Sequence, residues 1–287
     1  MKKTFKIGTR KSALALRQTE LAENALRAAY PSLRLERVLL QAKGDKVLDK
    51  PLWEIGRSGE GLFASELEGM LLRDEIDIAV HSGKDLPQFL PEGLEILAAL
   101  KRDDPRDVLV MPAGRSAGDC RTIGTGSLRR QAFLAELCPE AETRLIRGNV
   151  QTRLQKMMGG GYDGIVLAKA GLDRLSISER DGYAFHVFSL EECLPAACQG
   201  IIVVEGKPEL EELFGRISHR ETMMEFEAER RVMELMEAGC SQPAAAFAEY
   251  RNGEIRLWAM FGNRRAEGTA PAEKRLELAA EIAGRLK

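Results

Sequence analysis

The sequence predicts two similar α/β domains with mixed, mostly parallel sheets flanking a cleft, plus a small α+β C-terminal domain with an antiparallel sheet. Strand-like and helical segments alternate along the first part of the chain, and this rhythm restarts after the polar stretch 101–107. Near the C-terminus, Asn-Gly at 252–253 joins two apolar segments, which is typical of an antiparallel hairpin. The domain boundaries that we expect are 1–100 and 199–216 for domain 1, 101–198 for domain 2, and 217–287 for domain 3.

The first domain is predicted from strand and helix patterns that alternate. In chain order these are a strand at 5–8, an amphipathic helix at 12–29 that ends before Pro31, a strand at 35–40, a helix at 61–73 and a largely buried strand at 76–80. This order favours a mostly parallel sheet with helices on both faces.

The second and third domains are predicted from the same kinds of pattern. In the second, strands are expected at 108–111, 122–124, 143–146 and 165–168, with helices from about Ser127 and at 149–158 and a glycine turn at 159–161. In the third, a charged helix at 218–237 precedes strands at 245–250 and 255–261 and a final helix at about 271–286. Two α/β units joined by short crossovers imply a cleft between them, where small ligands usually bind.

The composition is that of a soluble globular protein, with 44% hydrophobic and 30% charged residues among 287. The apolar runs are too short to span a bilayer and the N-terminus does not resemble a signal peptide, so we expect a cytoplasmic protein. Its five cysteines should be reduced. They form no Cys-x-x-Cys pair and the three histidines lie far apart, so no metal site is expected. A net charge of -2 argues against nucleic-acid binding.

Arginine is concentrated where predicted strands meet predicted helices. Of 42 basic residues, 28 are Arg and 14 are Lys. Three junctions pair Arg with a residue that can cap a helix: Arg10 with Ser12, Arg129 and Arg130 with Ser127, and Arg147 and Arg153 with Asn149. Each junction alone could be an ordinary turn or a solvated charged face. Together they predict a cleft lined by guanidinium groups, whose ligand carries several carboxylates or phosphates.

Two further residues have local contexts that permit a chemical role. Asp85 directly follows the buried strand 76–80, at the carboxyl edge where catalytic groups collect, and among cations it should stay ionised. A turn cap before Pro87 explains it equally well. Cys240 lies in a tight loop bounded by Gly239 and Pro243, where small neighbours would let a bulky group approach its sulfur, although a buried structural thiol is the default interpretation.

These segments, taken in order, resemble the signature stretches of the porphobilinogen deaminase family, also called hydroxymethylbilane synthases. The similar stretches include 8–16 (GTRKSALAL), 43–45 (KGD), 61–63 (GLF), 79–82 (AVHS), 84–87 (KDLP), 104–107 (DPRD), 127–131 (SLRRQ), 147–154 (RGNVQTRL), 170–175 (AGLDRL), 199–200 (QG), 228–230 (AER) and 239–240 (GC). The resemblance runs from the first strand to about residue 250. It implies the two-domain layout of type II periplasmic binding proteins with a third domain added.

The resemblance also implies an activity and roles for individual residues. The enzymes of this family are transferases that join four porphobilinogen molecules head to tail on a covalent dipyrromethane cofactor, with loss of ammonia, and then release the linear tetrapyrrole hydroxymethylbilane. By position, Cys240 matches the cysteine that carries the cofactor through a thioether, and Asp85 matches the catalytic aspartate. The cofactor-binding positions are matched by Ser12, Lys84, Asp85, Ser127, Arg129 and Arg130, and the substrate-binding positions by Arg10, Ser12, Arg147, Arg153, Arg174 and Gln199. A monomer is expected by resemblance only.

The chain departs from the family pattern at several places. The usual Gly-Lys-Gly before Leu62 is Gly-Glu-Gly at 59–61, after an apparent short insertion at 57–58, and a common lysine before Glu66 is Ser65. Gly83 stands where a larger apolar residue is common, and Cys198 where Gly is usual. The C-terminal domain also ends early.

Two other functions fit parts of the pattern. A non-catalytic anion-binding protein of the solute-binding type would share the Arg-lined cleft, but it needs an export signal and has no use for a third domain with Cys240. A deaminase homologue with weakened activity would share every motif.

Overall fold

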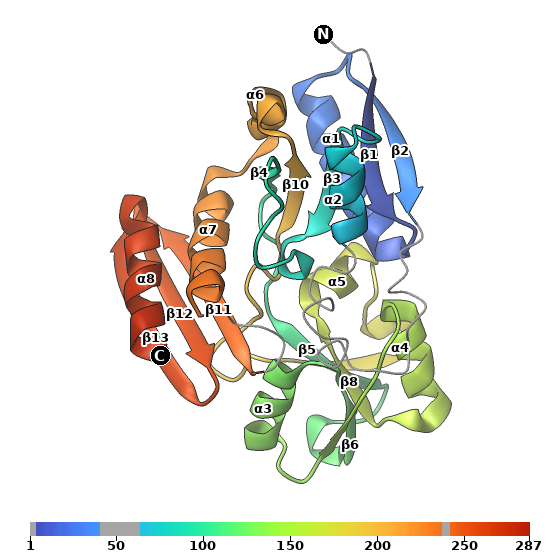
Figure 1. Cartoon of the computed structure of the whole chain (residues 1–287). Helices are drawn as coiled ribbons and strands as arrows, with labels where there is room; N and C mark the ends of the chain where they lie inside the picture. The colour runs from blue at the N-terminus through green and yellow to red at the C-terminus, as the bar shows by residue number, and fades with distance from the viewer. Residues whose placement is uncertain (1–3, 41–63, 237–241) are drawn as a thin grey trace.

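The computed structural model describes residues 4–40, 64–236 and 242–287. Within them the strands form two five-stranded sheets and one three-stranded sheet. The two larger sheets lie one above the other in Figure 1, and the small sheet lies to one side of both. This arrangement confirms the predicted fold class.

The first sheet has the strand order β2-β1-β3-β10-β4 and is packed by helices of the same unit. Its strands are β1 (Thr4–Arg10), β2 (Arg34–Leu40), β3 (Ile78–Ser82), β4 (Glu95–Ala99) and β10 (Ile202–Gly206), with helices α1 (Ala13–Ala29), α2 (Ser65–Leu72) and α6 (Glu211–Phe214). Ile7, Leu26 and Phe214 are fully buried in one core cluster of this unit. The alternation of strand and helix therefore produces the predicted layered unit.

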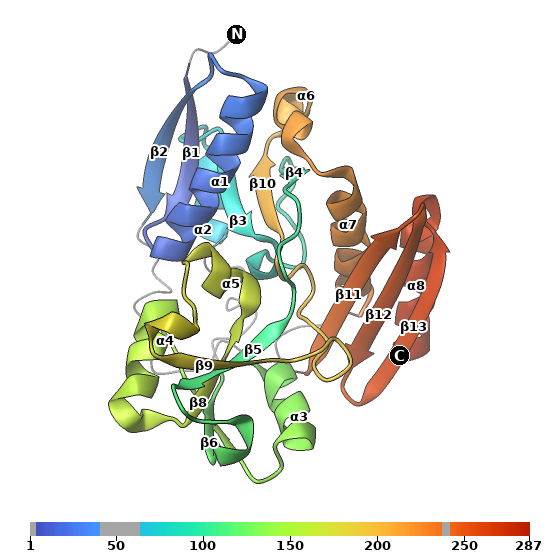
Figure 2. The same cartoon turned by 180° about the vertical axis from the view of Figure 1, so that it is seen from behind.

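The second sheet has the order β7-β6-β8-β5-β9. Its strands are β5 (Asp107–Pro112), β6 (Thr122–Gly124), β7 (Glu142–Arg144), β8 (Gly164–Ala168) and β9 (Tyr183–Val187), with helices α3 (Leu128–Leu137), α4 (Val150–Lys156) and α5 (Lys169–Arg174). Leu109 and Ile123 are buried in one core cluster of this unit and Ile165 in another. Helix α5 lies where the two units meet, beside α1 (Figure 2).

Each large sheet contains one strand that arrives from the other unit and runs against its neighbours. β10 is antiparallel to β3 and β4, and β5 is antiparallel to β8 and β9. The remaining pairs, β1 with β2 and β3, and β6 with β7 and β8, are parallel. A strand that follows a crossover enters its sheet from the opposite end, so the sheets are more mixed than the βαβ rhythm indicates.

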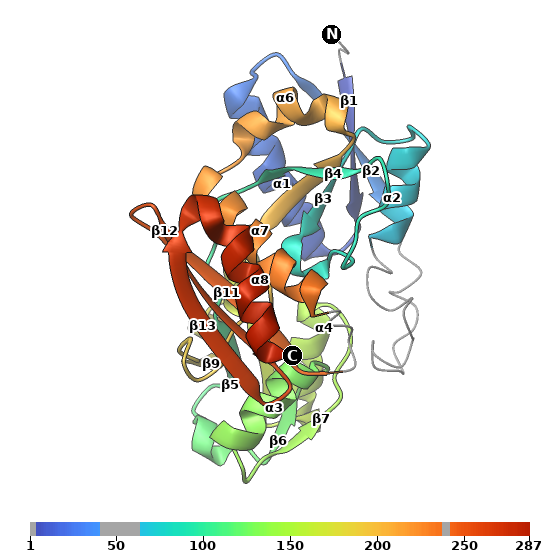
Figure 3. The ribbon, with the colours of Figure 1, turned by 60° about the vertical axis from the view of Figure 1, so that its left-hand side comes forward.

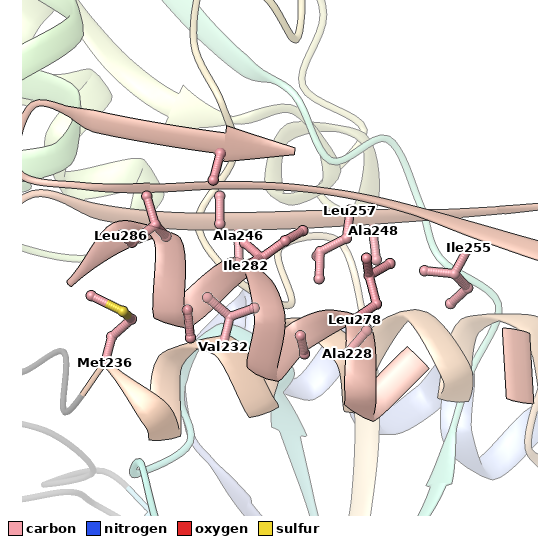
Figure 4. Close-up of a cluster of buried hydrophobic side chains, with 14 of the residues drawn as sticks. Ala228, Val232, Met236, Ala246, Ala248, Ile255, Leu257, Leu278, Ile282 and Leu286 are labelled. Carbon is pink, nitrogen blue, oxygen red and sulfur yellow. The ribbon is translucent and has the colours of Figure 1, made fainter. Parts of the chain in front are cut away.

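The third unit packs two helices against one face of an antiparallel sheet. It consists of α7 (Arg220–Leu235), β11 (Ala244–Arg251), β12 (Glu254–Phe261), β13 (Arg264–Pro271) and α8 (Arg275–Leu286). Figure 3 shows α8 lying across the sheet. In Figure 4 the side chains of Val232, Ile282 and Leu257 meet in the layer between helices and strands, and all three are fully or almost fully buried. The Asn-Gly turn makes the predicted hairpin, with Asn252 at φ 52° and Gly253 at φ 88°.

The two crossovers between the large sheets lie against each other and against α7. The Arg102 guanidinium donates to the Gln199 carbonyl at 2.9 Å and to Glu229 Oε1 at 2.5 Å. Gly200 has φ 88°, and a Cβ there would lie 2.6 Å from the Asp103 carbonyl oxygen, so this close approach requires glycine. Glu229 comes from α7, so one buried ion pair ties the third unit to the point where the first two meet.

Some predicted boundaries were wrong. β3 begins at Ile78 and continues to Ser82, because β10 pairs with it along its whole length, whereas the predicted strand was 76–80. The strand predicted at 143–146 is β7 (Glu142–Arg144), and the final helix begins only at Arg275. β13, which is rich in charged and small residues, gave no strand pattern. Of the helix predicted at 61–73, residues 61–63 lie outside the described residues.

None of the helices in the described ranges is long and apolar enough to cross a membrane.

Candidate active site

The three Arg-bearing junctions are built as strand ends followed by capped helices. Ser12 Oγ accepts from the Ala15 amide at 3.3 Å at the start of α1, and Asn149 Oδ1 accepts from the Thr152 amide at 2.9 Å at the start of α4. Ser127 caps α3 in the same way, accepting from the Arg130 amide at 3.5 Å. These caps satisfy first-turn amides and fix where each helix begins, which sets the position of the arginines beside them.

Arg129 and Arg130 both bind one buried carboxylate, that of Asp107 at the start of β5. Arg130 Nη2 lies 2.7 Å from Asp107 Oδ1, and Arg129 Nη2 lies 2.7 Å from Asp107 Oδ2. Burial alone would raise the pKa of Asp107, but the charges of the two arginines outweigh it and hold that pKa well below its usual value. Asp107 was not predicted as a site residue, although it stands in the 104–107 stretch directly before a buried strand.

Gln199 connects Asp107 to Lys84, which comes from the other unit. Gln199 Nε2 donates to Asp107 Oδ1 at 3.0 Å, and Lys84 Nζ donates to Gln199 Oε1 at 3.1 Å. The Lys84 side chain is open to solvent, yet the protein around it lowers its pKa to about 8 by desolvation, which the neighbouring Asp85 carboxylate opposes. Gln199 itself is fully buried. The structure thus joins five residues from both units in one hydrogen-bonded network, namely Lys84, Gln199, Asp107, Arg129 and Arg130.

Asp85 is exposed and lies in a short 3-10 helix of one turn, Gly83–Asp85, that follows β3. Burial lowers the pKa of Lys84 beside it and of Arg153 and Arg174 in the second unit, and the charge of Asp85 partly offsets this lowering in all three. Asp85 therefore lies within electrostatic reach of cations from both units.

Arg147 and Arg153 are cations that the described residues do not neutralise. The pKa of Arg153 is lowered to about 10, first by burial and then by the charges of Arg130 and Arg147, and burial also lowers the pKa of Arg147. The Arg147 guanidinium makes no hydrogen bond or ion pair with any described residue, and Arg130 Nε is buried without a partner among them. Arg153 Nε donates to the Gly148 carbonyl at 2.7 Å, which does not neutralise its charge. Desolvated cations with donors to spare suit an anionic ligand.

The remaining predicted residues take other positions. Arg174 donates to Asp103 Oδ2 at 2.8 Å and to the Gly200 carbonyl at 2.6 Å, so it links the two crossovers. It also interacts electrostatically with Asp85. Arg10 is half-buried at the end of β1. Cys240, with residues 43–45 and 57–63, lies outside the described residues.

Gly83 and Cys198 form a contact that no sequence pattern indicated. A Cβ on Gly83 would lie 2.9 Å from Cys198 Cβ and 3.3 Å from the Cys198 carbonyl oxygen. Cys198 is buried and has φ 61°, a conformation that favours glycine. The Cys198 side chain thus occupies the space that a side chain at position 83 would need, next to the turn that carries Lys84 and Asp85.

Within the described part of the chain, no three His, Cys, Asp or Glu residues form a group that could hold a metal ion.

Comparison with known proteins gives consistent matches over nearly the whole chain. The family model described as "Porphobilinogen deaminase, dipyromethane cofactor binding domain" matches residues 5–214, and that of the "Porphobilinogen deaminase, C-terminal domain" matches 223–286. A porphobilinogen deaminase of Ruminiclostridium josui is 43% identical over 91% of this chain and 88% of its own length. One from Desulforamulus reducens is 39% identical over 100% of this chain and 95% of its own.

Solved structures with similar folds are more distant. The VFT2 domain of Bordetella pertussis BvgS matches with a TM-score of 0.45 and 14% identity, over 75% of this chain and 86% of that one. The periplasmic aliphatic sulphonate binding protein SsuA from Escherichia coli matches with a TM-score of 0.44 and 13% identity, over 81% of this chain and 70% of that one.

Proposed function

The chain belongs to the porphobilinogen deaminase family, and we propose that it carries out the stepwise condensation of four porphobilinogen molecules to hydroxymethylbilane. The observation that carries this assignment is one exposed carboxylate, Asp85, lying among cations of both units. The reaction needs the cations because its substrate is an anion, and it needs the carboxylate because its electrophile is a cation.

The cations supply the binding part of the proposal. Each pyrrole of the substrate and of the product chain carries two carboxylates, so negative charge accumulates as the chain grows. Arg147 and Arg153 lack neutralising partners among the described residues, and a bound carboxylate would replace the water they lose. Arg10, Ser12, Arg174 and Gln199 are proposed to complete the substrate contacts, on the strength of their matching positions.

Asp85 supplies the chemical part. Loss of ammonia from porphobilinogen leaves a pyrrole-derived cation, which an adjacent carboxylate stabilises. The same carboxylate can accept and return a proton as ammonia leaves and the new carbon–carbon bond forms. Its exposed position at the end of β3 allows contact with a ring that lies between the two units.

The residues around Asp85 also fit the family's dipyrromethane cofactor. Arg130 Nε, which is buried without a partner among the described residues, and the solvent-accessible Lys84 amine are donors of the kind that cofactor carboxylates require. We propose that Lys84, Arg129 and Arg130, with Ser12 and Ser127, hold these carboxylates, and that Cys240 forms the thioether. When bound, the dipyrromethane supplies the pyrrole end on which the product chain is built.

Family membership favours the enzyme over a non-catalytic anion-binding protein, which would need the cations but no Asp85. The same relationship supports the expectation of a cytoplasmic monomer.

Asp85→Asn tests the catalytic role, since it keeps the side-chain shape and removes the charge. We expect turnover of porphobilinogen to fall by roughly a hundredfold or more, with the cofactor still attached. Glu92→Gln, which changes an exposed carboxylate of the same unit, is the control and should keep full activity. Normal turnover in Asp85→Asn would move the catalytic role to another residue.

A further inference from the structure

Asp107 is a buried acid that the mechanism above does not use. It is 0% exposed at the first position of β5, so it cannot touch a ligand directly. Its oxygens bind Nη2 of Arg130 and of Arg129, each at 2.7 Å. Adjacent residues of a helix point about 100° apart, so this one carboxylate draws together two side chains that would otherwise diverge.

Each of these arginines is also anchored a second time. Arg129 Nη1 donates to the Leu194 carbonyl at 2.7 Å, and Arg130 Nη1 donates to the Val166 carbonyl at 2.8 Å. With both terminal nitrogens held, each guanidinium plane has a single orientation. Arg130 Nε has no partner among the described residues, so part of its donor capacity is left for something else.

The influence of Asp107 extends across the crossover to the first unit. Gln199 Nε2 donates to Asp107 Oδ1 at 3.0 Å and to the Pro105 carbonyl at 2.7 Å, which fixes the direction of its amide. Gln199 Oε1 is then left to accept from Lys84 Nζ at 3.1 Å. The position of a cation in one unit thus depends on a carboxylate in the other.

We propose that Asp107 is a positioning residue for the reaction, which holds Arg129, Arg130 and, through Gln199, Lys84 as one preformed site for pyrrole carboxylates. One buried negative charge against two guanidinium groups leaves a net positive charge, so Asp107 orients both arginines and the cluster still attracts an anion. This role rests on the proposed function, because it concerns the carboxylates of that substrate and cofactor.

Removing the charge of Asp107 has a consequence that a purely structural role would not produce. The charged groups that act on Lys84 are Asp85 and Asp107, which raise its pKa, and Arg130 and Arg129, which lower it. Without the Asp107 charge the pKa of Lys84 falls further. Lys84 then loses its proton at lower pH, and the site's hold on pyrrole carboxylates, those of the cofactor and of the substrate joined to it, weakens from a lower pH upward.

Asp107→Asn and Asp107→Glu test the proposal, with Asp104→Asn as the matched control. Asp104 lies in the same segment and pairs with Arg106 at a partly exposed position, away from Arg129 and Arg130. KM, kcat and their pH dependence for porphobilinogen are measured, together with melting temperature and the intact mass of each protein.

In folded Asp107→Asn we expect KM to rise roughly ten- to hundredfold, kcat to change less, and the basic limb of the kcat/KM profile to move to lower pH. Asp107→Glu keeps the charge but displaces it, so KM should rise without that movement. Wild-type kinetics in either folded variant would overturn the positioning role, and failure of both to fold would make Asp107 a stability residue only. An inactive wild-type chain without the cofactor adduct would instead refute the proposed function itself.

Discussion

The contact between Gly83 and Cys198 supports the turn that carries Lys84 and Asp85. Gly83→Ala adds one carbon atom to this contact and changes no other residue of the turn. Gly83 is not among the residues with positive φ, so alanine is allowed by the backbone. Its Cβ would nevertheless lie 2.9 Å from Cys198 Cβ and 3.4 Å from Phe226 Cε2, where contacts between carbon atoms are normally 3.5–4.0 Å. Overpacking of this kind costs about 1–3 kcal/mol, which lowers the melting temperature by roughly 2–12 °C.

Cys198→Gly should remove the obstacle. Relief of the φ 61° backbone at Cys198 contributes about 1 kcal/mol, and losing a small buried side chain costs about as much, so this substitution alone should be nearly neutral. In the double variant Gly83→Ala, Cys198→Gly, the new Cβ occupies the vacated space. We expect a favourable coupling of about 1–2 kcal/mol between the two changes.

The assay is a double-mutant cycle read by thermal unfolding and by the initial rate of porphobilinogen consumption. Gly83→Ala should lose both stability and rate, because the turn that carries Asp85 must move, and the double variant should recover both. Strictly additive effects of the two substitutions would refute the inferred replacement of one side chain by the other.

Three other perturbations have outcomes fixed by the same structure. Glu229→Gln removes the nearer carboxylate from the buried Arg102 and leaves Glu225 at 3.7 Å as its remaining ion pair, so we expect a loss of about 1.5–3 kcal/mol, measured as a fall in melting temperature; a change under about 2 °C would contradict the role of the Arg102–Glu229 pair. Burial and the nearby Glu205 charge raise the pKa of Glu68 from its usual value of 4.5 to about 7. Between these two pH values Glu68 keeps its proton in the folded chain and loses it in the unfolded chain. Stability should therefore fall as pH rises from about 4.5 to about 7, and Glu68→Gln should flatten this slope in melting temperatures taken across that range. Arg153→Met removes a desolvated cation but also its hydrogen bond to the Gly148 carbonyl, so the unliganded protein should melt close to the wild type while KM for porphobilinogen rises roughly ten- to hundredfold; a clearly lower melting temperature with unchanged KM would show that Arg153 serves the fold instead.

Features that depend on local chemistry were predictable from the sequence. Ser12 and Asn149 cap their helices as expected, because an N-cap needs only a short polar side chain and the amides that follow it. The Asn-Gly hairpin also depends only on local chemistry, since both residues adopt positive φ readily.

Features that depend on distant contacts were not predictable. β10 runs against its neighbours only because the chain returns from the other unit, and no periodicity encodes that direction. Asp107 belongs to a recognisable stretch, but its partners come from α3 and from the second crossover. Gly83 and Cys198 stood out as two separate departures from the family pattern, and only the fold shows that one compensates for the other.

The mass of the intact protein tests most directly whether Cys240 carries the covalent dipyrromethane on which the reaction depends. We predict that the wild-type chain and the control Cys138→Ser exceed the 31.8 kDa of the unmodified chain by a two-pyrrole adduct, and that Cys240→Ser shows the unmodified mass and no turnover. A wild-type chain of unmodified mass that still converts porphobilinogen would contradict the covalent primer.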